Sequence, residues 1–218
     1  MYELLYMPYY PNLNLLFIHI PKTGGSAIED ELQKKNIKST LIQRGQSVAG
    51  ICNNMLDHPY KNNSLQHQFY STIYTFRDKL NVNFENIRVF SVVRNPYDRI
   101  ISDLIWLKLI NRDASPQKVF DVIKNNYLYR TDLDNHNQPQ YKFITNDNGV
   151  IYPNIIILRC ETLNESNDKL NEYIGVSINI RKSNVNKDYS KYLNQDSIHM
   201  INEFYKKDFE LFNYKLLD

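Results

Sequence analysis

This sequence of 218 residues has few cysteines, no long apolar segment and no signal-peptide pattern, and each of these absences excludes a class of protein. The only cysteines are Cys52 and Cys160, too few for a disulfide framework, so we expect reduced thiols. No segment approaches the roughly 20 apolar residues that a membrane-spanning helix needs. The apolar segment 13–20 has neither a basic region before it nor a small-residue cleavage site after it, so it is not predicted to be a signal peptide. These absences predict a cytoplasmic protein with no membrane span.

Excess charge is also missing. The chain has 26 Lys and Arg residues against 24 Asp and Glu, a net charge of +2. This balance argues against a nucleic-acid partner, so any basic site must be local. Hydrophobic residues make up 42% of the chain and charged residues 23%, values typical of a folded globular protein. The length suits one domain, which we expect to span residues 1–218.

Apolar segments of strand length alternate with segments of helical periodicity. The expected strands are residues 13–20, 87–93 and 155–158, and the expected helices are 26–36, 69–80, 96–109, 115–125, 162–174 and 196–212. Pro96 suits the first turn of its helix, and Thr162 and Gly175 resemble the caps of another. Strands that alternate with helices predict an α/β fold, here a central parallel sheet flanked by helices in a P-loop-like domain.

Residues 21–26, PKTGGS, follow the first expected strand and open a helix. Glycines at such a turn let backbone N–H groups face an anion, and the helix dipole adds to the attraction. Lys22 adds a mobile positive charge. In a Walker A loop the lysine follows the glycines, whereas here it precedes both. This order counts against a nucleotide kinase or NTPase, which stays the main alternative.

A second basic segment, RNPYDRIIS at residues 94–102, follows the second expected strand. Arg94 would leave the carboxyl end of that strand, where open α/β sheets bind ligands, and its planar guanidinium suits bidentate contact with a phosphate. Ser102 would lie in the next helix and add a hydroxyl group.

These two segments, in this order, resemble the PAPS-dependent sulfotransferases, in particular the carbohydrate branch that includes heparan sulfate 2-O-sulfotransferase. That branch shows Pro-Lys-Thr-x-x-(Ser/Thr) after its first strand and Arg-(Asn/Asp)-Pro-(aromatic)-(acidic)-Arg-x-x-Ser later. Weaker similarity extends the resemblance over roughly residues 15–214. The resemblance implies PAPS (3'-phosphoadenosine 5'-phosphosulfate) as donor, PAP as product, a hydroxyl acceptor on a glycan and no metal requirement. Most relatives carry a membrane anchor that this chain lacks, so it would be a microbial or viral form or a shortened one.

The resemblance implies that each of the two basic segments contacts a different part of the donor. The 5'-phosphosulfate would contact Lys22, Thr23, Gly24, Gly25 and Ser26. The 3'-phosphate would contact Arg94 and Ser102, and the loop that covers the nucleotide would contain Arg181, Lys182 and Ser183. Lys22 would also stabilise the leaving group during transfer.

Sulfuryl transfer needs a base for the acceptor hydroxyl, and a neutral imidazole with an ordinary pKa near 6.5 is suited to it. Of the five histidines, His67 ranks first, since members of the branch carry a histidine at that relative place; His136 is second and His58 third. His136 and Gln140 are also candidates for contact with the acceptor. A non-catalytic module that binds PAPS or PAP remains a second alternative.

Overall fold

The computed structural model describes residues 6–41, 64–180 and 189–218. Its main sheet has the strand order β2-β3-β5-β6. The parallel strands are β3 (Leu15–Ile18), β5 (Arg88–Val93) and β6 (Ile155–Arg159). β2 (Tyr9–Tyr10) is antiparallel at the edge, and a separate antiparallel pair consists of β1 (Tyr6–Met7) and β4 (Thr40–Leu41). The expected α/β fold with a mostly parallel sheet flanked by helices is confirmed.

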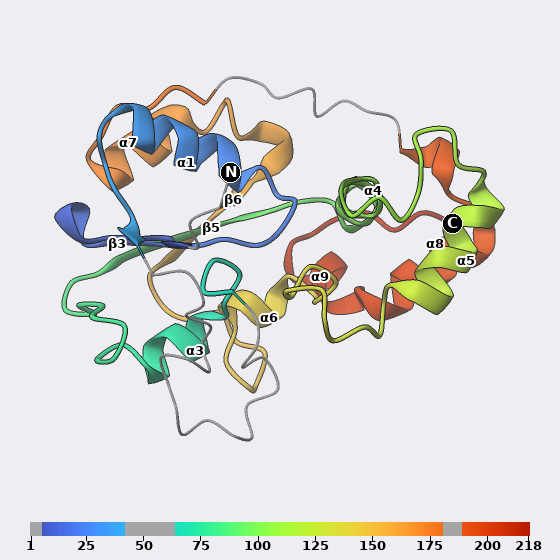
Figure 1. The fold of residues 1–218 in the computed structure, drawn as a ribbon, viewed down its shortest axis with the longest axis horizontal. Coiled ribbons are helices and arrows are strands. Elements are labelled where there is room, and N and C mark those ends of the chain that lie inside the picture. Colours follow the sequence, from blue (N-terminus) through green and yellow to red (C-terminus); the bar gives the residue numbers. More distant parts are fainter. Residues whose placement is uncertain (1–5, 42–63, 181–188) are drawn as a thin grey trace.

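The helices surround this sheet on both faces and at one end (Figure 1). The α-helices are α1 (Gly25–Lys34), α3 (Tyr70–Thr75), α4 (Pro96–Trp106), α5 (Pro116–Asn126), α6 (Tyr141–Ile144), α7 (Asn167–Ile174), α8 (Gln195–Phe204) and α9 (Lys206–Leu211). Short 3₁₀ turns are η1 (Pro11–Leu13), η2 (Cys160–Thr162) and η3 (Ser190–Tyr192). Among the described residues, none of these helices is both long and apolar enough to cross a bilayer.

Alternate side chains of the strands pack against opposite layers of helices. Leu15 and Phe17 of β3 belong to a buried cluster with residues of α1 and α7, whereas Leu16 and Ile18 belong to another with residues of α3 and α6. This period of two is what a sheet covered on both faces requires. Figure 1 shows α1 and α7 on one side of the sheet and α3 and α6 on the other.

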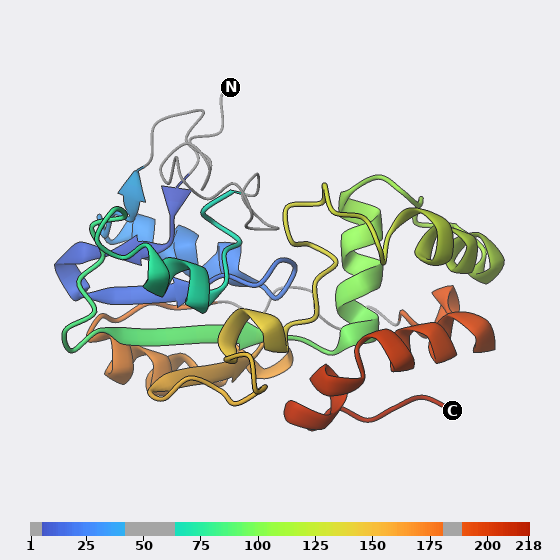
Figure 2. The same ribbon diagram turned by 90° about the horizontal axis from the view of Figure 1, so that it is seen from below.

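The remaining helices, α4, α5, α8 and α9, lie beyond the carboxyl ends of the parallel strands (Figures 1 and 2). They share a third apolar cluster, which includes Leu104, Ile123 and Ile201. α4 begins as expected, with Pro96 in its first turn and the Asn95 side chain accepting a hydrogen bond from the Tyr97 N–H. This group of helices therefore forms the wall against which the strand-end loops pack.

Four expected helices differ in extent, and one of them, 96–109, ends three residues early as α4. The 69–80 helix is only α3, since aromatic and β-branched residues are poor helix formers, yet Phe69, Ile73 and Leu80 are buried as their spacing indicated. Thr162 is not a cap; it ends η2, and α7 begins at Asn167, although Gly175 caps its far end with a left-handed φ of 73°. The 196–212 segment divides at Tyr205 into α8 and α9.

Candidate functional site

The loop between β3 and α1 curls tightly at the carboxyl end of its strand. Lys22 and Gly24 both have left-handed backbones, with φ of 64° and 91°. Gly25 begins α1, and a Cβ there would lie 2.6 Å from the His19 ring and 2.7 Å from Phe17. Only glycine therefore lets the loop pass this closely over His19. The Ala27 N–H donates to the Gly24 carbonyl at 3.2 Å, and the N–H groups before it lie at the positive end of α1, which is attractive to an anion.

Arg94 stands at the carboxyl end of β5, the strand beside β3. It is 7% exposed, and one terminal nitrogen donates to the Lys22 carbonyl at 3.1 Å. Its Nε is buried and has no hydrogen-bond partner among the described residues. A buried guanidinium nitrogen without a partner is costly, and an anionic ligand would supply the acceptor. This observation fits a phosphate-bearing donor.

An open cavity of about 730 Å³ lies between the loop, Arg94 and α4. Its volume is in the range of small-molecule sites. From the expected donor-binding set, the cavity is lined by Lys22, Gly24, Gly25, Ser26, Arg94 and Ser102. From the expected base and acceptor set, it is lined by His67 and His136. One cavity thus brings together cations and imidazoles that are as much as 114 residues apart in the sequence (22 to 136).

Arg99, the second arginine of the RNPYDR segment, lies on α4 and holds two parts of the cavity wall together. It is 2% exposed and donates from Nε to the Pro21 carbonyl at 3.0 Å. Its terminal nitrogens donate to the carbonyls of Gln138 and His136 at 2.9 and 2.7 Å. A single buried side chain therefore ties the glycine loop to the segment that carries His136.

His67 is held by a carboxylate. Its Nδ1 lies 2.8 Å from Asp134 Oδ2, and Asp134 also accepts from the Ser64 N–H and hydroxyl at 2.6 and 2.7 Å. Although burial acts to raise it, these hydrogen bonds hold the pKa of Asp134 below its ordinary value. An ionised carboxylate only accepts, so Nδ1 carries the proton and Nε2 of a neutral His67 is left as an acceptor.

Burial lowers the pKa of His67 to about 4, against the opposing effect of its hydrogen bond to Asp134. The value lies below the ordinary 6.5 that the sequence alone suggested. Removal from water disfavours the imidazolium, and His19 and His136 add further repulsion. His67 is therefore neutral throughout the physiological pH range.

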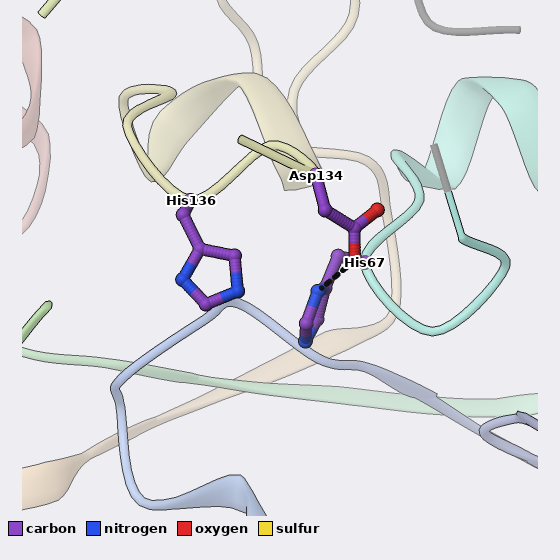
Figure 3. Close-up of side chains that lie close together, drawn as sticks. All are labelled: His67, Asp134 and His136. Atoms are coloured by element: carbon purple, nitrogen blue, oxygen red, sulfur yellow. Dashed lines mark hydrogen bonds and ion pairs between the residues drawn. The ribbon is translucent and has the colours of Figure 1, made fainter. Parts of the chain in front are cut away.

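Two more histidines flank His67, and each is paired with a carboxylate. His136 Nδ1 lies 2.6 Å from Asp103 Oδ1, and His19 Nδ1 lies 2.9 Å from Glu29 Oε1. Both rings meet that of His67 edge to face, with centroids 5.0 and 5.2 Å away. Figure 3 shows His67 and Asp134 facing each other beside the ring of His136. The three rings form a continuous row along the cavity.

His67, Asp134 and His136 also offer atoms within 4.8 Å of one another that could hold a metal ion. The Nδ1 atoms of both histidines are already engaged by Asp134 and Asp103. The hydrogen bonds from Asp134 and Asp103 therefore leave the Nε2 atoms of His67 and His136 as the nitrogens available to a ligand.

Some expected site residues lie elsewhere. Thr23 is fully buried and its hydroxyl donates to the Ile20 carbonyl at 2.8 Å, so only its backbone is available to a ligand. Gln140 is fully buried behind the cavity, where its amide group bonds both the N–H and the carbonyl of Arg94 at 2.8 Å. The structure therefore gives Gln140 a role in holding Arg94 and does not bring it to an acceptor. Outside the described residues lie Cys52, His58, Arg181, Lys182 and Ser183.

Three residues of the site were not predicted from the sequence: Asp134, Asp103 and Trp106. Asp134 is two residues before His136 but holds His67, so its local spacing gave no signal of its partner. Trp106 is four residues after Ser102, on the same side of α4. Asp103 gave no signal, because a fully buried carboxylate is not distinguishable in sequence from an exposed one.

Comparison with known families matches the chain to a model described as the sulfotransferase family over residues 8–215. Since the match covers nearly the whole chain, the protein belongs to the sulfotransferase family. Membership supports sulfotransfer activity in general and is consistent with the P-loop-like fold. A comparison with curated proteins gives no significant match.

Proposed function

We propose that the protein transfers the sulfuryl group of PAPS to a hydroxyl group of a carbohydrate. The observation that carries the proposal is the shared cavity, in which the Lys22 loop and the unpaired Arg94 Nε stand opposite a neutral, carboxylate-held His67. An anion-binding end and a proton-accepting end in one cavity are the two requirements of sulfuryl transfer to an alcohol.

At the anion-binding end, Arg94 and Ser102 would hold the 3'-phosphate of the donor. The N–H groups of the loop and of the first turn of α1, from Thr23 to Ser26, would hold the 5'-phosphosulfate. Burial lowers the pKa of Lys22, while Asp103 acts to raise it and Arg94 to lower it. The Lys22 side chain is long enough to follow charge as it moves onto the leaving phosphate.

At the proton-accepting end, His67 Nε2 would take the proton of the acceptor hydroxyl. The hydroxyl oxygen attacks sulfur from the side opposite the phosphate, a new O–S bond forms, and the bond from sulfur to the 5'-phosphate oxygen breaks. The electron pair leaves with PAP, where Lys22 stabilises it. His136 lies beside His67 and is the second candidate for the base.

The test is sulfate transfer from labelled PAPS to a panel of glycans, phenols and peptides, run with and without a chelator. We expect label on a glycan, with no loss of rate when EDTA is present. A nucleotide kinase would need ATP and Mg²⁺, and a non-catalytic binding module would bind PAP without modifying any acceptor. Either outcome, or label on phenols alone, would contradict the proposal.

A further inference from the structure

Trp106 is the last residue of α4 and the only tryptophan in the sequence. Its side chain is 58% exposed and lines the cavity beside Lys22 and His136. The chemistry proposed above makes no use of it, since an indole ring neither binds a phosphate strongly nor accepts a proton. A large aromatic ring left open in the wall of a substrate cavity is typical of a surface that a ligand covers.

The position of the ring is fixed by its neighbours. The imidazole of His136 is stacked on it, with centroids 4.9 Å apart and planes inclined by 10°. His136 is in turn held by Asp103, one turn earlier on α4. Because His136 also touches His67, the row of rings runs from Trp106 to the base without interruption. A ligand stacked on Trp106 would therefore lie at the proton-accepting end of the cavity.

Lys22 also contacts the Trp106 ring. Its Nζ lies 5.0 Å from the centroid of the Trp106 ring, a cation–π contact. Such a contact at an exposed site is weak, whereas an ammonium group binds a phosphate or sulfate oxygen more strongly. The arrival of an anionic donor would thus draw Lys22 away from Trp106 and leave the ring open.

We propose that Trp106 is the acceptor platform, on which the apolar face of a pyranose ring stacks once the donor has drawn Lys22 away. The inference rests on the proposed function and adds two things to it: a residue that selects sugar acceptors and an order of binding, donor before acceptor. An aromatic ring suits a pyranose because it offers a flat apolar surface while the sugar hydroxyls stay free for His67 and water.

The single tryptophan makes the first half of the proposal directly measurable. Tryptophan fluorescence of the whole protein reports on Trp106 alone, so PAP should change it in a saturable way that tracks thermal stabilisation by PAP. In Lys22→Met the emission should differ before PAP is added, and saturating PAP should change it little, although Arg94 still allows stabilisation. Stabilisation by PAP with unchanged wild-type emission would overturn the coupling and leave the donor assignment intact. No stabilisation by PAP would instead refute the proposed function.

The second half is tested by steady-state transfer to O-desulfated heparin, desulfated chondroitin and dextran. For the best acceptor, Trp106→Ala should raise KM by about tenfold with kcat changed by about twofold or less, as for a truncated aromatic anchor. Trp106→Phe should restore most of the affinity, and PAP stabilisation should be unchanged in both variants. Tyr129→Ala, an exposed aromatic outside the cavity, is the matched control. An unchanged KM in Trp106→Ala, or no sulfation of any of these glycans by a protein that binds PAP, would overturn the platform.

Discussion

The two ends of the cavity are built in different ways. The end that we propose binds the anionic donor, the anion-binding end, is made largely by one continuous piece of chain. In it β3, a loop with left-handed backbones and the start of α1 follow one another within about a dozen residues. The proton-accepting end brings together His67 and His136 from two separate segments, each held by its own carboxylate. Backbone geometry shapes the first end, and paired side chains shape the second.

This difference predicts which readout each substitution changes. Damage at the anion-binding end should alter both nucleotide binding and turnover, because in the proposed reaction the same groups would hold the donor and stabilise the leaving phosphate. Loss of His67 or of the carboxylate that holds it, at the proton-accepting end, should lower turnover and leave nucleotide binding unchanged. The three substitutions described next test that separation.

The largest effect is expected at His67. His67→Ala should reduce turnover by roughly 10²–10⁴-fold, the contribution of a general base, while PAP stabilises the variant nearly as well as the wild type. His199→Ala, an exposed histidine on α8 outside the cavity, is the control. If His67→Ala keeps most of its turnover and His136→Ala does not, the base is His136.

The next effect is expected at Lys22. Lys22→Met keeps the length of the side chain but removes its charge, and should lower turnover by on the order of a hundredfold, as for the loss of a transition-state charge stabiliser. Unlike His67→Ala, it should also weaken PAP binding. Lys118→Met, on the exposed face of α5, should match the wild type. Near-normal turnover in Lys22→Met would remove Lys22 from the transferring group.

A smaller effect is expected at Asp134, whose carboxylate accepts a hydrogen bond from His67 and so positions its ring. Asp134→Asn should lower kcat by roughly 10- to 100-fold, the loss typical when an orienting partner is removed from a functional group. Thermal stabilisation by PAP and the KM for the acceptor should be unchanged. Asp147→Asn, at an exposed position, serves as the control. Equal losses in PAP binding and kcat would instead show that Asp134 supports the whole cavity.

The smallest effect is expected from mild acid. His67 must be neutral to accept a proton, and its pKa lies at about 4, so protonation becomes extensive only below that pH. The rate should therefore retain about nine-tenths of its pH 7 value at pH 5, whereas a histidine with an ordinary pKa would retain about 4%. A pH–rate profile of kcat measures this. A fall centred near 6.5 would mean that the base is a histidine in contact with water.

The loop and Arg94 could be singled out from the sequence, because strand, glycine turn and helix are local features that leave a local pattern. The loop over residues 21–26 and Arg94 were both expected, and both line the cavity. Thr23 was the exception, since a hydroxyl that bonds the Ile20 carbonyl looks the same in sequence as one that faces a ligand.

The proton-accepting end could be predicted only in part. His67 and His136 were chosen as separate candidates, and nothing in the chain showed that their rings would lie 5.0 Å apart. Their carboxylate partners are 67 and 33 residues away, so the pairs exist only after the chain has folded. Gln140 illustrates the opposite error: a polar residue near a candidate histidine was expected to face the acceptor, but it is buried against Arg94.

The central claim, that the anion-binding end takes a nucleotide with a 3'-phosphate, is tested most directly by thermal unfolding with PAP and with AMP at matched concentrations. If Arg94 and Ser102 hold the 3'-phosphate, PAP should raise the Tm of the wild type clearly and AMP much less, because only a ligand that binds the folded state tightly shifts the equilibrium. Arg94→Leu should abolish most of that difference. Equal shifts for PAP and AMP, or a preference for ATP with Mg²⁺, would contradict the account.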